Sequence, residues 1–416
     1  MTRSQPIKAV RGMRDILPAE RPLWRTVERA AREVAGRFGY EEIVTPIVEP
    51  AELIERAGED SDAFVKELYR FEDRSGRLVA LRPEATASVV RAYFEHGFDK
   101  GPKPSRLVLL GPMFRYDRPQ KGRYRQFFQL DVEAIGSASP ALDVEVIELA
   151  RDWLQKVGLT NLRLELNTIG DSRCRPAYLE RLKAYYRPLK AQLSPDSQER
   201  LERNPLRLLD SKASEDVQLK LRAPRVMDHL CSGCARHWEV VQRGLQAANI
   251  DYELNPYLVR GLDYYTRTVF EFFPGQRSGQ QDALGGGGRY DGLAEAEGWE
   301  STPAVGFASG LDRVTELLAA SKTVVATQPA AEVVVMPEGD LQMEAAEVAR
   351  ICRTVRSTAV DYESAKFTWR LAEKAGARWV VLMRPNEAAR RTARLREVAS
   401  RTDVEVRWEE LPARLT

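Results

Sequence analysis

Cysteine and histidine are scarce in this chain, with only 4 and 3 among its 416 residues. A small secreted domain held together by disulfides needs a dense and regular set of cysteines. This chain has instead a sparse and uneven set, Cys174, Cys231, Cys234 and Cys352. The cysteine count therefore excludes a disulfide scaffold, and we expect the thiols to be reduced.

One pair of cysteines has the spacing of metal ligands. Cys231 and Cys234 form a CxxC motif, and His229 and His237 lie close to it in the sequence. Such a set can supply the four ligands of a zinc ion. However, apolar residues recur at helical spacing from Val226 to Leu245, which favours thiols packed in a core. We therefore expect no zinc.

Long apolar runs and a strong net charge are also missing. No stretch approaches the roughly 18 consecutive apolar residues of a membrane span, and residues 1–6 lack the apolar segment of a signal peptide. We expect a cytoplasmic protein without a membrane partner. Charged residues make up 30% of the chain, yet the formal net charge is only +2. RNA contacts must therefore come from local basic patches.

The length and the distribution of residue types predict more than one domain. Residues 171–248 are rich in Arg, Lys, Glu and Leu at helical spacing, which indicates an inserted helical segment. Residues 319–329 are small and polar, as in a linker, and strands alternate with helices after them. We predict a core of residues 1–170 and 249–320, a helical insertion of residues 171–248, and an α/β domain of residues 330–416.

Periodicity also predicts individual elements. In the core we expect a helix over Pro22–Phe38 and strands over Glu41–Pro46, Leu107–Leu110, Phe127–Ile135, Asp251–Leu258 and Thr268–Phe273. Beyond the linker we expect strands over Glu332–Met336, Trp379–Met383 and Asp403–Trp408, with helices over Leu341–Val355 and Phe367–Ala375.

The most informative stretch is GPMFRYDRPQKGRYRQFFQ at residues 111–129, which sets a group of cations in a polar loop between two apolar strands. The cations are Arg115, Arg118, Lys121, Arg123 and Arg125. A rigid hairpin can hold arginine forks against a polyphosphate. Alone, the stretch would more simply be a solvated basic turn.

Further segments occur together with this stretch. They are VRGMRD at 10–15, LRPEAT at 81–86, LVRGLDYYTRT at 258–268, GGGRYDGL at 286–293 and PAVGFASGLDR at 303–313. In order and spacing they resemble the histidyl-tRNA synthetases, a family of class II aminoacyl-tRNA synthetases. The segment around Arg260 is the most specific of them, whereas a glycine-rich run alone is a weak signal.

The resemblance implies a fold, a reaction and partners. The fold is an α+β catalytic core with a mixed, mainly antiparallel sheet of the class II synthetase type, a helical insertion, and a C-terminal α/β anticodon-binding domain. The reaction ligates L-histidine to tRNA(His) through a histidyl-adenylate. ATP, with Mg²⁺, is the second substrate, and the enzyme is a homodimer.

The resemblance also assigns cations to the reacting phosphates. Arg260 stands where other class II synthetases place a metal ion near the α-phosphate, so it is expected to be catalytic. Arg115 contacts the α-phosphate and the histidine carboxylate, whereas Arg123 and Arg313 bind the remaining part of ATP. No metal ligand from the protein is implied.

Another set of residues is expected to bind histidine, by pairing its ammonium group and both imidazole nitrogens. The set comprises Glu84, Ala85, Thr86, Gln129, Glu133, Tyr264, Tyr265 and Tyr290. Glu133 and Tyr265 are the expected imidazole partners. Two positions depart from the family pattern, because Ala85 replaces a usual glycine and Phe128 replaces a common histidine.

Partner surfaces follow from the same resemblance. Pro46 marks the expected dimer interface, although it also fits an ordinary strand end. The loop at 118–121 is expected to hold the tRNA acceptor end, with Gln120 near the extra 5′ guanosine that this family reads. Basic residues of the last domain are either phosphate contacts or a solvated face, and they are Arg390, Arg391, Arg394 and Arg396.

Two other classes of protein compete with a synthetase. One is an inactive synthetase paralogue that serves as a regulatory subunit of ATP phosphoribosyltransferase, and the other is an RNA-binding module without chemistry. Such regulatory paralogues typically lose parts of the arginine set and lack the anticodon domain. A simple RNA-binding module would not need the residues expected to bind imidazole. The sequence therefore favours the active enzyme.

Overall fold

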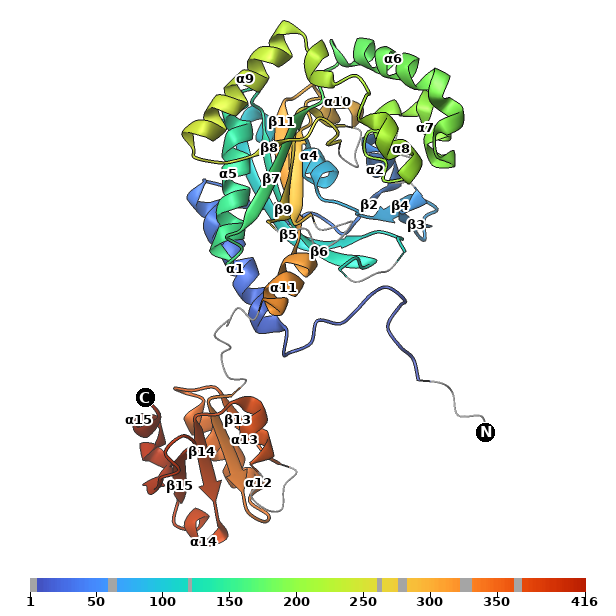
Figure 1. Cartoon of the computed structure of the whole chain (residues 1–416). Coiled ribbons are helices and arrows are strands. Elements are labelled where there is room, and N and C mark those ends of the chain that lie inside the picture. The colour runs from blue at the N-terminus through green and yellow to red at the C-terminus, as the bar shows by residue number, and fades with distance from the viewer. Residues whose placement is uncertain are drawn as a thin grey trace, which may run out of the picture. The chain divides into compact units, whose positions relative to one another are not determined.

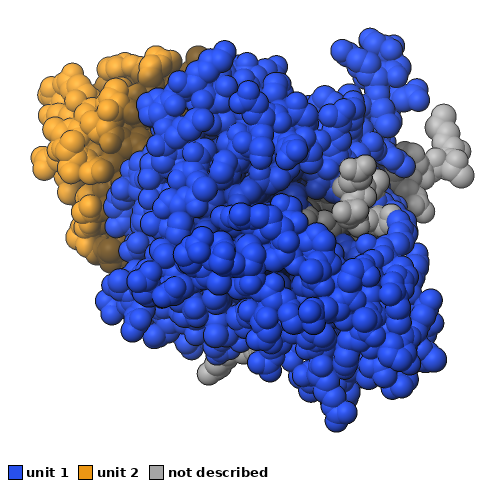
Figure 2. All heavy atoms as spheres, turned by 90° about the horizontal axis from the view of Figure 1, so that it is seen from above, with its two compact units in different colours: residues 1–325 blue, residues 326–416 orange. Residues whose placement is uncertain are grey.

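The computed structural model describes residues 6–58, 66–118, 122–259, 264–275, 283–321, 331–362 and 369–416. The chain divides into two compact units, Met1–Val325 and Ala326–Thr416, which are coloured separately in Figure 2. Each unit is described by itself. No described helix combines the length and apolar composition that crossing a bilayer requires.

The first unit is built on an eight-stranded sheet with the order β1-β5-β6-β11-β10-β9-β7-β8 (Figure 1). Its strands are β1 (Glu41–Glu42), β5 (Ser105–Phe114), β6 (Gln126–Ile135), β7 (Leu162–Thr168), β8 (Glu253–Leu254), β9 (Thr266–Pro274), β10 (Gly285–Arg289) and β11 (Ala304–Gly310). The inner pairs are antiparallel, whereas the edge pairs β1–β5 and β7–β8 are parallel. The prediction of a mixed, mainly antiparallel sheet is therefore confirmed.

Helices cover one face of this sheet (Figure 1). They are α1 (Arg21–Arg37), α5 (Pro140–Lys156), α9 (Ser232–Ala247) and α11 (Leu311–Ala320). Trp24 and Val34 of α1, Trp153 of α5 and Val241 of α9 are buried in one cluster with Val132 of β6. This cluster is the main hydrophobic core of the unit.

Shorter elements pack against part of the opposite face. They are α2 (Ala51–Ala57), α4 (Thr86–Glu95), α10 (Leu293–Ala296), the 3₁₀ turn η1 (Phe98–Lys100), and a small antiparallel sheet of β2 (Val48–Pro50), β4 (Leu78–Leu81) and β3 (Tyr69–Glu72). Leu107 and Leu109 of β5 are buried against this group, while Val108 between them joins the main core. The alternation shows that both faces of β5 are covered.

The segment between β7 and β9 is mostly helical. It contains α6 (Arg175–Tyr186), η2 (Arg187–Gln192), α7 (Pro195–Arg203), η3 (Pro205–Leu208), α8 (Ser214–Lys220), η4 (Val226–His229), α9 and the two-residue strand β8. Apart from α9, its helices lie as a separate group beside the sheet (Figure 1). Tyr178, Leu182 and Leu208 form its own core, which reaches β9 through Val269.

The second unit is a five-stranded sheet with the order β13-β12-β14-β15-β16. Its elements are β12 (Val333–Pro337), α12 (Gln342–Cys352), β13 (Thr358–Val360), α13 (Arg370–Ala375), β14 (Trp379–Met383), α14 (Pro385–Ala388), β15 (Thr392–Glu397), β16 (Asp403–Arg407), η5 (Trp408–Glu410) and α15 (Leu411–Leu415). β13, β12 and β14 are parallel to one another, whereas β15 is antiparallel to both of its neighbours, β14 and β16. Hydrophobic clusters lie on both faces of the sheet, as expected for an α/β unit.

Several predicted elements differ from the structure. The strand expected over Glu41–Pro46 is reduced to Glu41–Glu42, and Pro46 precedes β2. The strand expected over Asp251–Leu258 is reduced to Glu253–Leu254. The linker expected from Ala319 begins later, because α11 continues to Ala320. Residues 322–330 and 363–368 lie outside the described residues, so part of the linker and the start of the helix expected over Phe367–Ala375 are among them.

The helix expected over Val226–Leu245 is broken into η4 and α9. Leu230 and Cys231, between them, are extended, and the Cys231 sulfur accepts a hydrogen bond from the Cys234 amide at 3.5 Å. The sulfur thus satisfies an otherwise unpaired N–H group in the first turn of α9. A thiol acting as an N-cap, rather than as a core side chain, therefore marks the start of α9 within the periodic pattern.

No strand was predicted over the glycine run before Arg289, but it forms the interior strand β10. A Cβ added to Gly287 would lie 2.0 Å from the Gly306 carbonyl oxygen of β11. One added to Gly285 would lie 2.7 Å from the Ala308 carbonyl oxygen. The close approach of the neighbouring backbone requires glycine here, although glycine is a poor strand former.

A fully buried ion pair joins this strand to the helices behind it. The Arg289 Nε donates to Asp143 Oδ1 of α5 at 3.0 Å, and both side chains are inaccessible to solvent. Asp143 Oδ2 also accepts from the Thr268 hydroxyl of β9 at 2.6 Å and lies 2.7 Å from His237 Nε2 of α9. Although burial opposes ionisation, these partners hold the pKa of Asp143 below its ordinary value.

Replacing this carboxylate should destabilise the first unit strongly. Asp143→Asn leaves the buried Arg289 charge without its main counterion, so we expect a loss of roughly 3–5 kcal/mol in the free energy of unfolding. Glu145→Gln, on the same helix, removes the partly exposed pair with Arg106 and should cost less than about 1 kcal/mol. Denaturant titrations of both variants measure the difference, and equal losses would contradict the role of Asp143.

Candidate active site

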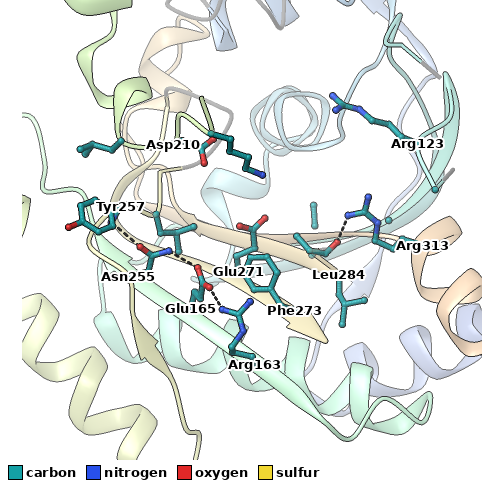
Figure 3. Close-up of a pocket in the computed structure, with 18 of the residues that line it drawn as sticks. Arg123, Arg163, Glu165, Asp210, Asn255, Tyr257, Glu271, Phe273, Leu284 and Arg313 are labelled. Atoms are coloured by element: carbon teal, nitrogen blue, oxygen red, sulfur yellow. Dashed lines mark hydrogen bonds and ion pairs between the residues drawn. The ribbon is translucent and has the colours of Figure 1, made fainter. Parts of the chain in front are cut away.

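A large pocket opens beside the sheet of the first unit. Its volume is about 1020 Å³, and residues from β6, β7, β9, β10, β11 and the helical segment line it. Arg123 and Arg313 lie on one side, and Asp210, Asn255 and Tyr257 lie on the other (Figure 3). The pocket therefore lies between the basic hairpin and the helical segment.

Arginines of the hairpin and of α11 enter this pocket. Arg115, just after β5, donates from Nε to the Pro83 carbonyl oxygen at 2.9 Å. Arg123 is ion-paired with Asp117 across the hairpin, and Arg313 donates to the Ala283 carbonyl oxygen at 2.8 Å. Burial lowers the pKa of Arg115, because a desolvated guanidinium is a less stable cation. The negative charge of a bound anion would offset the free-energy cost of desolvating this guanidinium. The pocket is therefore suited to phosphate.

Several pocket residues escaped the sequence analysis. Glu271 projects from β9 into the middle of the pocket (Figure 3), and Lys212 and Lys220 line it from the helical segment. Glu165 of β7 accepts from the Asn255 amide at 2.6 Å and is ion-paired with Arg163. Glu165 and Glu271 lie opposite each other in adjacent strands. The alternation of side chains along these strands could have predicted that the two carboxylates share one face of the sheet. The position of the lysines at the pocket depends on tertiary packing, which the sequence pattern does not indicate.

Behind the pocket lies a buried polar cluster, most of whose residues were predicted to bind histidine. Glu133 of β6 accepts from the Thr86 hydroxyl at 2.6 Å and from the Tyr290 hydroxyl. Glu84 accepts from the Thr86 amide at 3.1 Å and from the Tyr264 hydroxyl at 3.2 Å. The structure therefore brings these five residues into one hydrogen-bonded group.

The cluster and the pocket meet through β6 and Arg115. Gln129 lines the pocket, while Asp131 and Glu133 follow on the same face of the strand. The carbonyl that Arg115 contacts belongs to Pro83, which directly precedes Glu84. Asp131 escaped the sequence analysis, although both its carboxylate oxygens are buried without a hydrogen-bond partner among the described residues.

Electrostatics in the cluster favour neutral acids. Burial raises the pKa of Glu133 to about 8, against hydrogen bonds from Thr86 and Tyr290 that lower it. Burial and the nearby Glu133 and Glu84 also raise the pKa of Asp131 well above its ordinary value. Burial and the carboxylate of Glu84 raise the pKa of Tyr264. A cationic ligand in this cluster would lower these pKa values again, because a nearby positive charge favours the ionised carboxylates.

The other predicted binding residues lie in or around the cluster. The Tyr265 ring centroid lies 5.0 Å from that of Tyr264. Ala85 is fully buried in the hydrophobic group around α4, where its methyl group is accommodated. Phe128 packs edge-on against Trp24 at 5.5 Å on the opposite face of β6 from Gln129, as alternation predicts. The departure at Phe128 therefore affects the core rather than the pocket.

Some predicted residues lie outside the described part of the chain. These are Arg260, Gln120 and Lys121. In the second unit, the basic residues named from the sequence are all paired with carboxylates. The pairs are Arg390–Glu405, Arg391–Glu347, Arg394–Glu387 and Arg396–Asp403.

One group of described residues could hold a metal ion. Asp171, Cys174, Cys231 and Cys234 offer ligand atoms that all lie within 4.8 Å of one another. His237, suggested by the sequence, instead contacts Asp143 at 2.7 Å, and the His229 ring packs 6.0 Å from the Tyr178 ring. Asp171 and Cys174 could not be recognised as metal ligands from the sequence, because about sixty residues separate them from the CxxC motif.

The antiparallel sheet with arginines over a pocket defines the catalytic core of a class II aminoacyl-tRNA synthetase. A family model described as histidyl-tRNA synthetase matches residues 12–314. A histidine–tRNA ligase from Solibacter usitatus is 44% identical over 415 residues, which cover 98% of this chain and 99% of the relative. Another from Thermosynechococcus vestitus is 53% identical over 313 residues, 75% of this chain and 73% of the relative.

A solved structure agrees with these relatives. The apo histidyl-tRNA synthetase of S. aureus superposes with a TM-score of 0.81 at 32% identity, covering 99% of this chain and 100% of that chain. The chain belongs to the histidyl-tRNA synthetase family.

The raised pKa of Glu133 predicts a pH-dependent stability. An unfolded glutamate titrates near pH 4.3, so between that value and about 8 the native protein binds more protons than the unfolded chain. The contribution of Glu133 to the free energy of unfolding is therefore fully present at acidic pH, and it is lost as the pH rises through about 8.

Denaturant titrations of ligand-free protein between about pH 6 and pH 9 should show this loss, with a smaller fall for Glu133→Gln because an amide does not titrate. Asp131 also makes the protein less stable as the pH rises, because its pKa is raised too. The contribution of Glu133 is therefore measured by the difference between wild type and Glu133→Gln. Glu300→Gln, at an exposed position, is the matched control. Identical pH dependence in wild type and Glu133→Gln would contradict the prediction.

Proposed function

We propose that this protein ligates L-histidine to its cognate tRNA, using ATP and a histidyl-adenylate intermediate. The observation that carries the proposal is an arginine-lined pocket next to a closed cluster of carboxylates and tyrosines, within a chain of the histidyl-tRNA synthetase family. Adenylation of an amino acid requires a site for polyphosphate and a site for the amino acid, and we assign the pocket and the cluster to these two tasks.

In the first step, a carboxylate oxygen of histidine attacks the α-phosphorus of ATP, and the bond to the bridging oxygen of pyrophosphate breaks. In the second step, a ribose hydroxyl of tRNA attacks the carbonyl carbon, and AMP leaves. Negative charge builds up in both transition states, so fixed cations are the main catalytic resource. We assign this role to Arg115 and Arg260, with Arg123 and Arg313 holding the rest of ATP.

ATP would arrive with Mg²⁺, which prefers oxygen ligands and keeps several waters. The carboxylates that face the pocket, Glu165 and Glu271, are groups of this kind. When bound, the ion would neutralise phosphate charge. The two carboxylates would also keep ATP phosphates away from the β7–β9 side of the pocket by repulsion, which favours the arginine side.

We assign the buried cluster to the histidine substrate. Glu133 and Tyr265 would pair the imidazole nitrogens, and Glu84, Thr86 and Gln129 would accept from the ammonium group. Tyr264 and Tyr290 would enclose the ring, with Ala85 presenting the turn before Thr86. Glu133 and Thr86 already hydrogen-bond each other at 2.6 Å, so the acceptors are preorganised. An amino acid without the imidazole would leave these buried groups unpaired.

Further assignments concern the partners. We infer that residues 1–170 and 249–320 form the catalytic core, that 171–248 form a helical insertion, and that 330–416 bind the tRNA anticodon. The loop at 118–121 would hold the acceptor end. A homodimer through the Pro46 region is supported by exposed apolar side chains, Val44 among them with 80% exposure. A tRNA-charging enzyme works where tRNA is used, so a cytoplasmic location is part of the proposal.

The regulatory-subunit alternative is not favoured. Two relatives that match 98% and 99% of this chain, at 44% and 43% identity, carry the name histidine–tRNA ligase. The arginines that such a subunit would not need, Arg115 and Arg313, persist at the pocket.

Histidine-dependent ATP–pyrophosphate exchange tests the proposed function directly. Wild type should catalyse the exchange with histidine and not with other amino acids. Arg260→Ala should slow it by about 100- to 1,000-fold, the usual effect of removing one preorganised charge donor from a transition state. Arg222→Ala, at an exposed position, is the control and should leave the rate unchanged. Wild type without exchange would refute the function, whereas an active Arg260→Ala would refute only that residue's role.

Removal of residues 330–416 tests the anticodon assignment. Exchange should persist, because the arginines and the buried cluster all lie in the first unit. Charging of tRNA should fall sharply, since contacts far from the acceptor end are lost. Circular dichroism and solution mass first establish that the truncated protein folds and keeps its oligomeric state. Full charging by a folded truncated protein would show that the second unit has another task.

A further inference from the structure

We propose that Asp171, Cys174, Cys231 and Cys234 form a structural zinc site at the base of the helical segment. The sequence alone led us to expect no zinc, because the helical spacing of apolar residues from Val226 to Leu245 favoured thiols packed in a core. Folding removes both histidines from the site and brings in a third thiol and a carboxylate.

The distances between the ligand atoms suit a tetrahedral ion. Zinc binds sulfur at about 2.3 Å, which places two sulfur ligands of a tetrahedron roughly 3.8 Å apart. The Cys174 and Cys234 sulfurs lie 3.7 Å apart. Asp171 Oδ1 lies 3.7 Å from the Cys174 sulfur and 3.9 Å from the Cys231 sulfur. Only small side-chain adjustments would be needed to bind the ion.

The surroundings of the four groups resemble an outer shell that orients metal ligands. The Asp171 amide points at the Cys174 sulfur and the Cys234 amide points at the Cys231 sulfur, each at 3.5 Å. Arg173 and Arg267 contact Asp171 Oδ2 at 3.0 and 3.2 Å. The arginine side chains thus occupy Oδ2, whereas Oδ1 accepts from the Arg173 amide at 3.1 Å and also faces the Cys174 and Cys231 sulfurs.

Charge is balanced at the same place. Three thiolates and a carboxylate around Zn²⁺ carry a net charge of about −2, which must be compensated in a partly buried site. Arg173 and Arg267 supply positive charge beside Asp171. Cys174 and Cys231 are also the N-cap residues of α6 and α9, where helix dipoles stabilise anions.

Neither a disulfide nor simple core packing explains the arrangement of these four side chains as well as a zinc site does. A disulfide would use two of the three sulfurs and leave the third thiol beside the Asp171 carboxylate. Packing of thiols as small apolar groups does not call for a carboxylate among them. Thiolate-rich tetrahedral sites are typical of zinc, which also has no redox chemistry that could disturb a structural site.

The position of the site indicates its task. Asp171 and Cys174 stand where the chain leaves the sheet, and Cys231 and Cys234 stand where it enters α9. Arg267, which contacts Asp171, belongs to β9. Zinc would therefore tie both ends of the segment carrying Lys212 and Lys220 to the sheet, and so hold one wall of the pocket in place.

Metal content of the purified, tag-free full-length chain tests the site. Reduced protein loaded with Zn²⁺ and then freed of excess metal should retain about one zinc per chain, as expected for a closed four-ligand site. Cys231→Ala should lose at least 90% of it, whereas Cys352→Ala should retain it because that buried cysteine lies in the second unit. Cobalt loading adds a readout, because thiolate-to-cobalt absorption should appear in wild type and Cys352→Ala only.

Stability supplies a second measurement. Removal of zinc by a chelator should lower the melting temperature of wild type but not that of Cys231→Ala, which holds no metal to lose. A folded wild type that retains no zinc would overturn the proposal. So would equal zinc in Cys231→Ala, iron in place of zinc, or a Cys174–Cys234 disulfide in protein purified under reducing conditions.

Discussion

Side-chain alternation along β6 is the constraint on which both the core and the site depend. Leu130, Val132 and Ala134 face the main core, while Gln129, Asp131 and Glu133 face the pocket and the polar cluster. A shift of register by one residue would bury carboxylates among the helices and expose the apolar side chains, at a cost that no local contact could offset. The long pairing with β5 therefore fixes the substrate-facing residues as firmly as it fixes the core.

Glycine allows that alternation to coexist with close packing of the neighbouring strands. Gly306 of β11 lies opposite Glu133, and a Cβ there would come within 2.0 Å of the Glu133 carboxylate. Arg289, the last residue of β10, donates to Asp143 of α5. Glycine therefore weakens the strands at the positions where a neighbouring backbone or functional side chain comes close. The buried ion pair stabilises the same region, because it joins β10 to α5 and α9.

The elements that could be predicted from the sequence are those whose stability is local or whose apolar period is long. The first helix and the β5–β6 hairpin are of this kind, and both were located correctly. The glycine strand was missed because only its neighbours make it a strand. The break before α9 was missed because the Cys231 sulfur satisfies the backbone within an apolar period that continues past it. Arg115 and Tyr264 lie in the motifs of the sequence, and Glu133 was named from the family resemblance. Asp131 and Glu271 lie in no motif, and only the face of the strand on which they lie indicates their importance.

The cations of this protein differ in the groups that already contact them and with which a bound anion would have to compete. Arg391 of the second unit is exposed and paired with Glu347, so an RNA phosphate there must compete with a carboxylate in high dielectric. Arg115 lines the pocket and donates to the Pro83 carbonyl oxygen, and burial lowers the pKa of its guanidinium. Binding energy for an anion is therefore concentrated at the pocket, where desolvation strengthens each charge. Since Lys212 and Lys220 complete this pocket from the helical segment, the strength of anion binding also depends on how firmly both ends of that segment are attached to the sheet.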